Sequence, residues 1–319
     1  MSGPLWFSEA EVTRLLDPVA LVDGIEQALV AVHRGQLIEP RPTRIDDLGL
    51  GTNYVAFPSY WPDARYAGCK VLSGALRNPE RGLPMIDAII ALTEAETGRI
   101  VAVMDGRRIT ALRTAATTAV AIRHLAPSKG ATLGLIGTGA QMVAHAEAIS
   151  AVLPIGEIEI ASAGGSEARL MVAATAIEER TGRRVGTGSP ADVARKSDIV
   201  VLTTLSPNPV IGSDDLRPDA VVACVGPFRP AATEMDRAAL AGATMLVSDF
   251  AQRFLDHWAS DPLPGTIHDL PAELADRRTP PTSGRRIFFS DGRGLEDLVA
   301  ARLVFEASEA GTKAGLALP

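Results

Sequence analysis

The chain has 319 residues, 46% of them apolar, and a formal net charge of −7 at neutral pH, which is enough material for two domains with modest cores. The acidic balance argues against a nucleic-acid partner, because phosphate contacts need a basic face. Two isolated cysteines are too few for a disulfide framework or a zinc cluster.

The N-terminal region predicts helices rather than a targeting segment. Residues 1–7 lack the basic start and long apolar run of a signal peptide, and no later stretch of about 18 uncharged apolar residues would span a membrane, so we expect a cytoplasmic chain. Residues 8–34 predict one or two amphipathic helices. Ser8 and Glu11 fit a capping box at the start of this run, and Gly35 is expected to end it.

The region from Asn53 to Val103 predicts short strands separated by turns. The expected strands cover residues 54–57, 68–72, 85–92 and 100–104. Strands and helices do not alternate here, so this region is expected to form a sheet of its own. The alanine-rich run from Thr110 to Leu125 then predicts a helix closed by Pro127.

From Ala131 the pattern changes to a strict alternation of strands and helices. Strands are expected over residues 133–136, 158–161, 199–203, 220–225 and 245–247, and helices over 140–151, 167–180 and 189–196. Short, nearly continuous apolar strands alternating with helices are typical of a doubly wound parallel sheet covered on both faces. The fold class is therefore expected to be α/β, with a Rossmann-type domain beside a sheet-rich α+β domain.

The C-terminal piece leaves this alternation at about residue 285. A strand is expected over residues 286–290 and a helix over 295–310, and we place this piece with the first domain. The Rossmann-type domain would then be inserted into the other one. The expected domains are residues 1–116 completed by 290–319, and residues 117–289.

A glycine-rich turn joins the strand ending at Ile136 to the helix that follows. Its sequence is Gly137-Thr138-Gly139-Ala140-Gln141. Gly137 permits the tight turn and Gly139 permits close approach of the backbone to a pyrophosphate, which faces the amino end of the helix. This segment predicts a site for NAD or NADP.

The end of the second strand of this domain bears on the choice between the two cofactors. NAD is commonly bound there by an acid that contacts the ribose hydroxyls. The segment 161–166 contains no acid, whereas Ser162, Ser166 and the nearby Arg169 are able to accept a 2′-phosphate. The same residues also fit a small solvated loop. The pattern favours NADP over NAD.

Several cations stand in apolar surroundings. Lys70, one of four lysines among 31 basic residues, lies in an apolar strand, and Arg113 lies among small apolar residues of the predicted helix. A buried ammonium is costly unless it meets an anion, although an edge lysine that reaches solvent is the alternative. Arg41 and Arg44 lie between prolines, and either of them is a candidate for a third cation at the same pocket. Several cations around one pocket suit a small carboxylate.

Short segments in every part of the chain carry a family resemblance. In order they are Gly68–Val71, Leu92–Gly98, Val103–Gly106, Thr110–Ala116, Leu135–Gln141, Thr203–Thr204, Ala223–Gly226, Ser290–Gly292 and Glu296–Asp297. Together they resemble the ornithine cyclodeaminase/μ-crystallin family. The resemblance implies a homodimer whose first domain carries the substrate and the subunit contacts, in line with the edge strands that would otherwise lack burial.

The resemblance also implies roles for individual residues. A substrate carboxylate would be held by Arg44, Lys70 and Arg113, with Arg41 as the second choice for the first of these. Further cofactor contacts would come from the matched segments, at Thr114, Thr203, Val225 and Gly226.

Three positions depart from the family pattern. Phe228 stands where cyclodeaminases carry an acid/base aspartate, and Val55 stands where they carry a glutamate for the distal amino group of ornithine. Neither side chain holds an ammonium as a carboxylate does. Asp291 replaces a usually apolar residue, and it either reaches the pocket to bind a polar substrate group or caps the helix at Leu295.

These residues together predict an NAD(P)H-dependent reductase of a small imino acid, such as pyrroline- or piperideine-2-carboxylate. Lys70 or an ordered water would supply the proton, and the clamp cations are expected to lack partners until substrate binds. One alternative is a cyclodeaminase with tightly held NAD that uses Asp291 as its acid. A second is a protein that binds NADPH and a carboxylate ligand without turnover.

Overall fold

The computed structural model describes residues 3–47, 49–75, 77–126, 130–164, 166–226 and 228–308. The chain divides into two compact units, of which unit 1 comprises Met1–Arg113 with Arg293–Pro319 and unit 2 comprises Thr114–Gly292. Pro127 and Ala310, expected at the ends of two helices, lie outside the described residues. In the described part of the chain, none of the helices has the length and apolar character that crossing a membrane requires.

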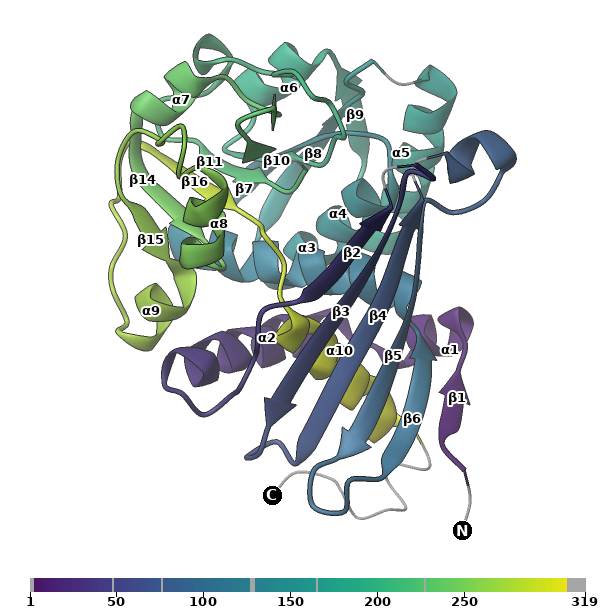
Figure 1. Ribbon diagram of the computed structural model, residues 1–319. Helices are drawn as coiled ribbons and strands as arrows, with labels where there is room; N and C mark the ends of the chain where they lie inside the picture. Colours follow the sequence, from purple (N-terminus) through teal and green to yellow (C-terminus); the bar gives the residue numbers. More distant parts are fainter. Residues whose placement is uncertain are drawn as a thin grey trace. The chain divides into compact units, whose positions relative to one another are not determined.

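Unit 1 contains a six-stranded sheet (Figure 1). Its strands, in spatial order, are β1 (Leu5–Phe7), β6 (Ile100–Asp105), β5 (Ile86–Glu94), β4 (Tyr66–Ala75), β3 (Thr52–Trp61) and β2 (Thr43–Asp47). β1 runs parallel to β6, and all other neighbours are antiparallel. The sequence did not predict the two edge strands. Every residue of β2 is exposed, so β2 lacks the alternation by which strands are identified.

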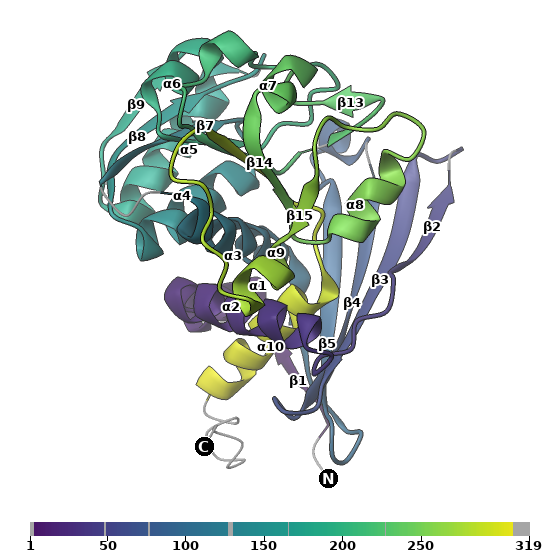
Figure 2. The same ribbon diagram turned by 90° about the vertical axis from the view of Figure 1, so that its left-hand side faces the viewer.

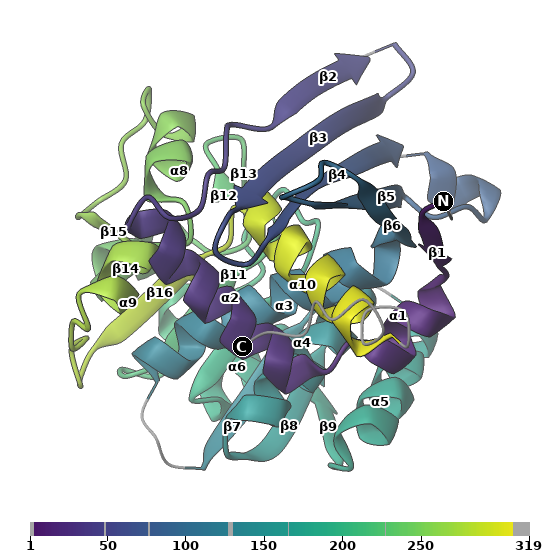
Figure 3. The same cartoon turned by 90° about the horizontal axis from the view of Figure 1, so that it is seen from below.

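Helices cover one face of this sheet. They are α1 (Glu9–Leu15), α2 (Pro18–His33) and α10 (Gly294–Ala307). A short 3₁₀ turn, η1 (Asn78–Arg81), lies between β4 and β5 in the chain. The expected capping box is confirmed, since Glu11 N donates to Ser8 Oγ and Ser8 N donates to Glu11 Oε2. Figure 3 shows α10 lying along β3, β4 and β5 with α2 beside it. A Cβ at Gly68 would lie 3.1 Å from Leu298, so the helix packs close to the sheet.

Unit 2 contains an eight-stranded parallel sheet (Figure 2). Its strands, in spatial order, are β15 (Ile267–Asp269), β14 (Ala243–Ser248), β16 (Arg285–Phe289), β11 (Val221–Cys224), β10 (Ile199–Leu202), β7 (Ala131–Ile136), β8 (Ile155–Ala161) and β9 (Val185–Gly188). Every neighbouring pair is parallel. All residues of β10 and β11 are buried, as expected of central strands covered on both faces. The predicted fold class is confirmed.

Short helices connect the strands of unit 2. They are α4 (Ala140–Val152), α5 (Glu167–Thr181), α6 (Pro190–Lys196), α7 (Arg237–Ala241), α8 (Ala251–His257) and α9 (Leu270–Ala275), with the hairpin β12 (Phe228–Arg229) and β13 (Ala232–Thr233) and the 3₁₀ turn η2 (Ser213–Asp215). The helix α3 (Gly106–Leu125) begins in unit 1, and the division between the units falls within it, after Arg113.

One expectation about the C-terminal piece is wrong. The strand expected over residues 286–290 was grouped with the first domain, although the expected bounds 117–289 include most of it. β16 lies between β11 and β14 of the parallel sheet, so the grouping is wrong and the bounds fit. The physical reason is burial, since Arg286 through Phe289 are buried and therefore need neighbouring strands on both sides. Only the segment from Arg293 onward belongs to unit 1.

Candidate active site

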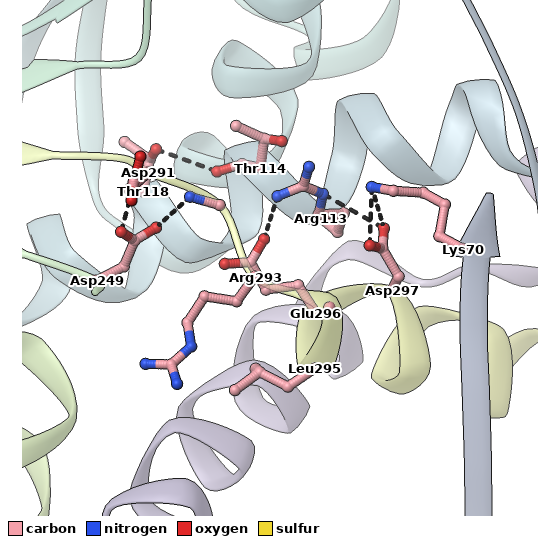
Figure 4. Close-up of polar contacts among 12 residues, drawn as sticks. Lys70, Arg113, Thr114, Thr118, Asp249, Asp291, Arg293, Leu295, Glu296 and Asp297 are labelled. Carbon is pink, nitrogen blue, oxygen red and sulfur yellow. Dashed lines mark hydrogen bonds and ion pairs between the residues drawn. The ribbon is translucent and has the colours of Figure 1, made fainter. Parts of the chain in front are cut away.

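The side chain of Lys70 lies between the sheet and α10 of unit 1. Period-two alternation turns Lys70 toward the covered face of β4, where it is fully buried. Its Nζ donates to Asp297 Oδ1 at 2.9 Å and lies 2.7 Å from Oδ2 (Figure 4). The ammonium also lies 4.7 Å from the centre of the Phe57 ring. Lys70 is therefore a buried cation and not an edge lysine that reaches solvent.

Arg113 converges on the same carboxylate from α3. Its Nη1 donates to Glu296 Oε2, and its Nε lies 3.4 Å from Asp297 Oδ1. Glu296 and Asp297 lie in the first turn of α10, where the amino end of a helix favours negative charge. Figure 4 shows Lys70 and Arg113 directed at Asp297 from two different elements.

A second ion pair secures the start of α10. Arg293 Nε donates to Glu39 Oε2 at 2.7 Å, and the backbone N–H of Leu295 donates to Glu39 Oε1 at 3.0 Å. Glu39 lies just before β2 in the sequence, and no local pattern distinguished it. Glu39 thus caps the amino end of α10, a role that the sequence offered as one of two interpretations of Asp291.

Burial shifts the pKa values of Lys70 and Glu296 in this cluster. Burial, together with the nearby Arg113 charge, lowers the pKa of Lys70 to about 8, although Asp297 and Glu296 act in the opposite direction. Burial also raises the pKa of Glu296, and its pairing with Arg113 offsets part of that rise. Lys70 thus remains mainly protonated at neutral pH, but its positive charge is lost within a moderate rise in pH.

The expectation that the clamp cations lack partners without substrate is wrong. Lys70 is paired with Asp297, and Arg113 is paired with Glu296 and Asp297. The physical reason is the cost of burying an ammonium or guanidinium without a counter-ion, which the two acids of α10 offset. Replacement of either cation therefore takes one cationic partner from a buried carboxylate.

Arg44 lies farther from this cluster, on the edge strand β2. Its guanidinium is half exposed and binds Asp46. In the sheet register Arg44 pairs with Val55, and Val55 pairs with Leu72, two residues from Lys70. Directly opposed residues share a face, so Arg44 lies on the same face of the sheet as Lys70. Arg41 precedes β2 and is exposed.

Phe228 and Val55 are core residues. The Phe228 ring is buried and packs against Phe254, Trp258 and Phe289. Val55 is also buried, on β3. Neither position offers a group that transfers a proton or binds an ammonium.

Asp291 is bound within unit 2. Its carboxylate pairs with Arg253 Nε, and Arg253 also donates to the carbonyl oxygens of Asp291 and Gly292. Asp249 accepts the backbone N–H groups of Asp291 and Gly292 at 2.8 and 3.1 Å. Asp291 does not cap α10, whose N-cap is Arg293, so the capping interpretation is wrong. Sequence reasoning missed Asp249, which carries no motif.

The glycine-rich turn lies between β7 and α4 of unit 2. Gly137 has φ +153°, and a Cβ there would lie 2.4 Å from Thr203 Oγ1, so a side chain does not fit. Gly139 is the N-cap of α4, and none of the described atoms lies within 4 Å of the Cβ position built on it. Ala140 and Gln141 open the helix, whose first backbone N–H groups lack helical partners. Thr138 lies between the glycines. These features fit a pyrophosphate group.

The ends of β10 and β11 are held together by a buried acid. Thr203 follows β10, Val225 and Gly226 follow β11, and both segments lie at the carboxyl edge of the sheet. Glu234 accepts hydrogen bonds from Thr204 N at 2.6 Å and from Gly226 N at 2.7 Å. Burial raises the pKa of Glu234 to about 7. Ligands of open parallel sheets bind at this edge, so Glu234 fixes two loops beside it. Sequence reasoning missed Glu234.

Two of the remaining cofactor candidates lie between β8 and α5. Ser162 follows β8, and Ser166 is the N-cap of α5 without a side-chain capping bond. Arg169 lines a hollow of about 350 Å³ together with Thr138, Gly139 and residues of α4 and α5. Thr114 lies on α3, and its carbonyl accepts a hydrogen bond from Thr118 Oγ1. Polar groups thus stand near the glycine-rich turn, while most of the hollow is apolar.

Comparison with known proteins agrees with this architecture. The model of the ornithine cyclodeaminase/mu-crystallin family matches residues 5–312. A Delta(1)-pyrroline-2-carboxylate reductase of Bacillus cereus is 30% identical over 314 residues, which are 95% of this chain and 96% of that protein. An alanine dehydrogenase of Archaeoglobus fulgidus is 30% identical over 253 residues, 76% of each chain.

A solved structure shares the fold over nearly the whole length. It is Thermococcus litoralis Delta(1)-pyrroline-2-carboxylate reductase in complex with NADH and L-proline. The TM-score is 0.89 at 24% identity, and the match covers 98% of both chains.

Proposed function

Because the chain belongs to the ornithine cyclodeaminase/mu-crystallin family, we propose that it is an NAD(P)H-dependent reductase of a small imino acid. Cyclic ketimine carboxylates, such as pyrroline- or piperideine-2-carboxylate, are the proposed substrates. The observation that carries this proposal is the convergence of Lys70 and Arg113 in one buried cluster. Relatives that span most of the chain, and that are named for pyrroline-2-carboxylate reduction, support it.

The proposed roles follow from the chemistry of the side chains. Arg113 presents a planar guanidinium and Lys70 a point charge, so together they bind and orient a carboxylate. Arg44, on the same sheet face, is the proposed third contact. A bound nicotinamide cofactor supplies the hydride for reduction of the imine. Lys70, with its pKa of about 8, is the proposed holder of the proton that the imine nitrogen needs.

The side chains at Val55 and Phe228 decide between this reductase and a cyclodeaminase. A diamino acid needs a carboxylate for its second ammonium, and these buried apolar residues do not supply one. Asp291, proposed in the alternative as the acid, is already paired with Arg253. The reductase is therefore the favoured function.

The test is a substrate screen that follows NADPH absorbance. Pyrroline-2-carboxylate or piperideine-2-carboxylate is expected to oxidise one NADPH per amino acid formed, whereas ornithine is expected to give no product. Pyruvate with an amine serves as the open-chain comparison. Formation of proline from ornithine without net NADPH oxidation would identify a cyclodeaminase instead. Saturable binding of all these compounds without turnover would identify a binding protein.

We propose further that NADPH binds at least as tightly as NADH, because residues 161–166 at the end of β8 contain no acid and Arg169 lines the hollow beside the glycine-rich turn. Ser162→Asp is expected to shift preference toward NADH through repulsion of the 2′-phosphate. Fluorescence titration of both cofactors measures the effect. Ser189→Asp, at the N-cap of α6, is the control for an added carboxylate, and its stability is measured alongside because Ser189 Oγ donates to Asp192. A roughly tenfold preference of the native chain for NADH contradicts the proposal.

We propose that two copies of unit 1 form a homodimer through the sheet face opposite Lys70. Large apolar side chains are exposed on this face, namely Ile45, Tyr54, Tyr60, Val71 and Ile89. Such a patch marks an interaction surface, and a second copy buries it symmetrically. Val71→Arg is expected to give monomers at micromolar concentration by light scattering. Val172→Arg on α5, where Val172 is 71% exposed, is expected to leave the dimer intact. A monomeric native chain overturns the proposal.

A further inference from the structure

The ion pairs around Lys70 within unit 1 join equal numbers of cations and carboxylates. The three cations are Lys70, Arg113 and Arg293, and the three carboxylates are Glu39, Glu296 and Asp297. A ligand carboxylate adds a fourth negative charge to this buried region. Arg44, the proposed third contact, brings its own counter-ion in Asp46 and so adds no net positive charge. An uncompensated charge in such a region is costly unless a proton neutralises it.

The three acids are not equally well compensated. Asp297 is bound by Lys70 at 2.7 and 2.9 Å and also faces Arg113, while Glu39 binds Arg293 and a backbone N–H. Glu296 is fully buried and has Arg113 as its cationic partner. Among the described residues, its Oε1 has no hydrogen-bond partner. A ligand carboxylate that binds Arg113 therefore competes most directly with Glu296.

We propose that Glu296 takes up one proton from solvent when the substrate carboxylate binds to Arg113 and Lys70. This inference rests on the proposed function, because it takes the carboxylate clamp as its premise. Glu296 is then a positioning residue, since its neutral form releases Arg113 to the ligand. No bond of the substrate forms or breaks in this step, and the proton is added to the carboxyl group of Glu296.

The sign of the pH effect follows from linkage. Burial raises the pKa of Glu296, the charges of Asp297 and Glu39 raise it further, and Arg113 lowers it. Competition for Arg113 raises it again in the complex, so the complex binds more protons than the free protein. Affinity therefore falls as pH rises between the two pKa values. Above pH 8 it falls further, because Lys70 loses its charge at a pKa of about 8.

The test measures protons directly. Pyrrole-2-carboxylate, a planar analogue without a reducible C=N bond, is titrated into the full chain with excess NADPH by calorimetry. Two buffers with different ionisation enthalpies at neutral pH give the number of protons exchanged. About one proton taken up per ligand is expected, with a dissociation constant that rises up to about tenfold per pH unit below pH 8.

Two variants locate the proton. Glu296→Gln is expected to abolish the uptake and to leave only the loss of affinity above pH 8. Glu96→Gln removes a carboxylate of unit 1 that is 76% exposed and lies outside this cluster, and it is expected to retain the uptake.

The outcomes separate this inference from the proposed function. Binding of the analogue to the native chain without proton uptake overturns the role of Glu296 and leaves the clamp standing. Uptake that persists in Glu296→Gln, or that is lost in Glu96→Gln, also overturns it. Absence of binding by any small carboxylate overturns the clamp and this inference together. If Glu296→Gln does not fold, the proton count and pH slope of the native chain still decide.

Discussion

Replacing Lys70 with Met is expected to lower kcat/KM, with a loss of transition-state stabilisation of about 2–4 kcal/mol. The same variant is expected to be less stable to unfolding. The first effect follows from loss of one arm of the carboxylate clamp. The second follows from Asp297, which would stay buried with Arg113 Nε 3.4 Å away as its remaining cationic contact. Breaking a buried pair in this way costs about 3–5 kcal/mol. Steady-state kinetics and thermal unfolding measure the two effects.

A double variant separates the two roles of Lys70. Lys70→Met with Asp297→Asn removes both buried charges and is expected to regain most of the lost stability without regaining activity. Lys196→Met is the control, because Lys196 is 60% exposed and its pair with Glu159 is worth about 1 kcal/mol at most. Native kcat/KM in Lys70→Met would place the carboxylate elsewhere. An unchanged melting temperature would mean that the pair with Asp297 does not stabilise the fold.

Replacing Gly137 with Ala is expected to weaken NAD(P)H binding by about 100-fold, or roughly 3 kcal/mol. The added Cβ would lie 2.4 Å from Thr203 Oγ1 and 2.9 Å from its carbonyl oxygen, so the turn must open. Opening misaligns the amino end of α4, which is the proposed anion site. The same clash and the unfavourable φ are expected to destabilise the fold by about 1–3 kcal/mol.

Gly139→Ala provides the matched comparison. Gly139 has φ −99°, and its built Cβ meets none of the described atoms within 4 Å, so stability is expected to stay within about 1 kcal/mol of the native value. Cofactor affinity is nevertheless expected to fall, because the methyl group occupies the space where a pyrophosphate approaches the backbone. Thermal unfolding and fluorescence titration separate the two variants. Native affinity in Gly139→Ala would exclude this turn as the pyrophosphate site.

Local sequence patterns were sufficient for the central strands of unit 2 and for α4, α5 and α6, but not for the edge strands β9 and β15 or for the helices α7, α8 and α9. The turn at Gly137 lies between β7 and α4 as expected, because a buried strand, a glycine pair and a helix are all encoded within about 20 residues. The same reasoning failed for β2, whose residues are all exposed, and it gave no consistent domain for β16. Neither the edge position of β2 nor the sheet to which β16 belongs is encoded by periodicity.

Some residues of the candidate site were also predicted from the sequence, whereas others were found only in the tertiary structure. Composition and neighbours identified Lys70 and Arg113 as cations in apolar surroundings, because a charged residue within an apolar run is visible in the sequence itself. Their partners were decided only by the tertiary structure. Lys70 and Asp297 are 227 positions apart, and Arg293 and Glu39 are 254 apart. These ion pairs exist because α10 packs against the sheet of unit 1, and that packing depends on long-range burial rather than on any local sequence pattern.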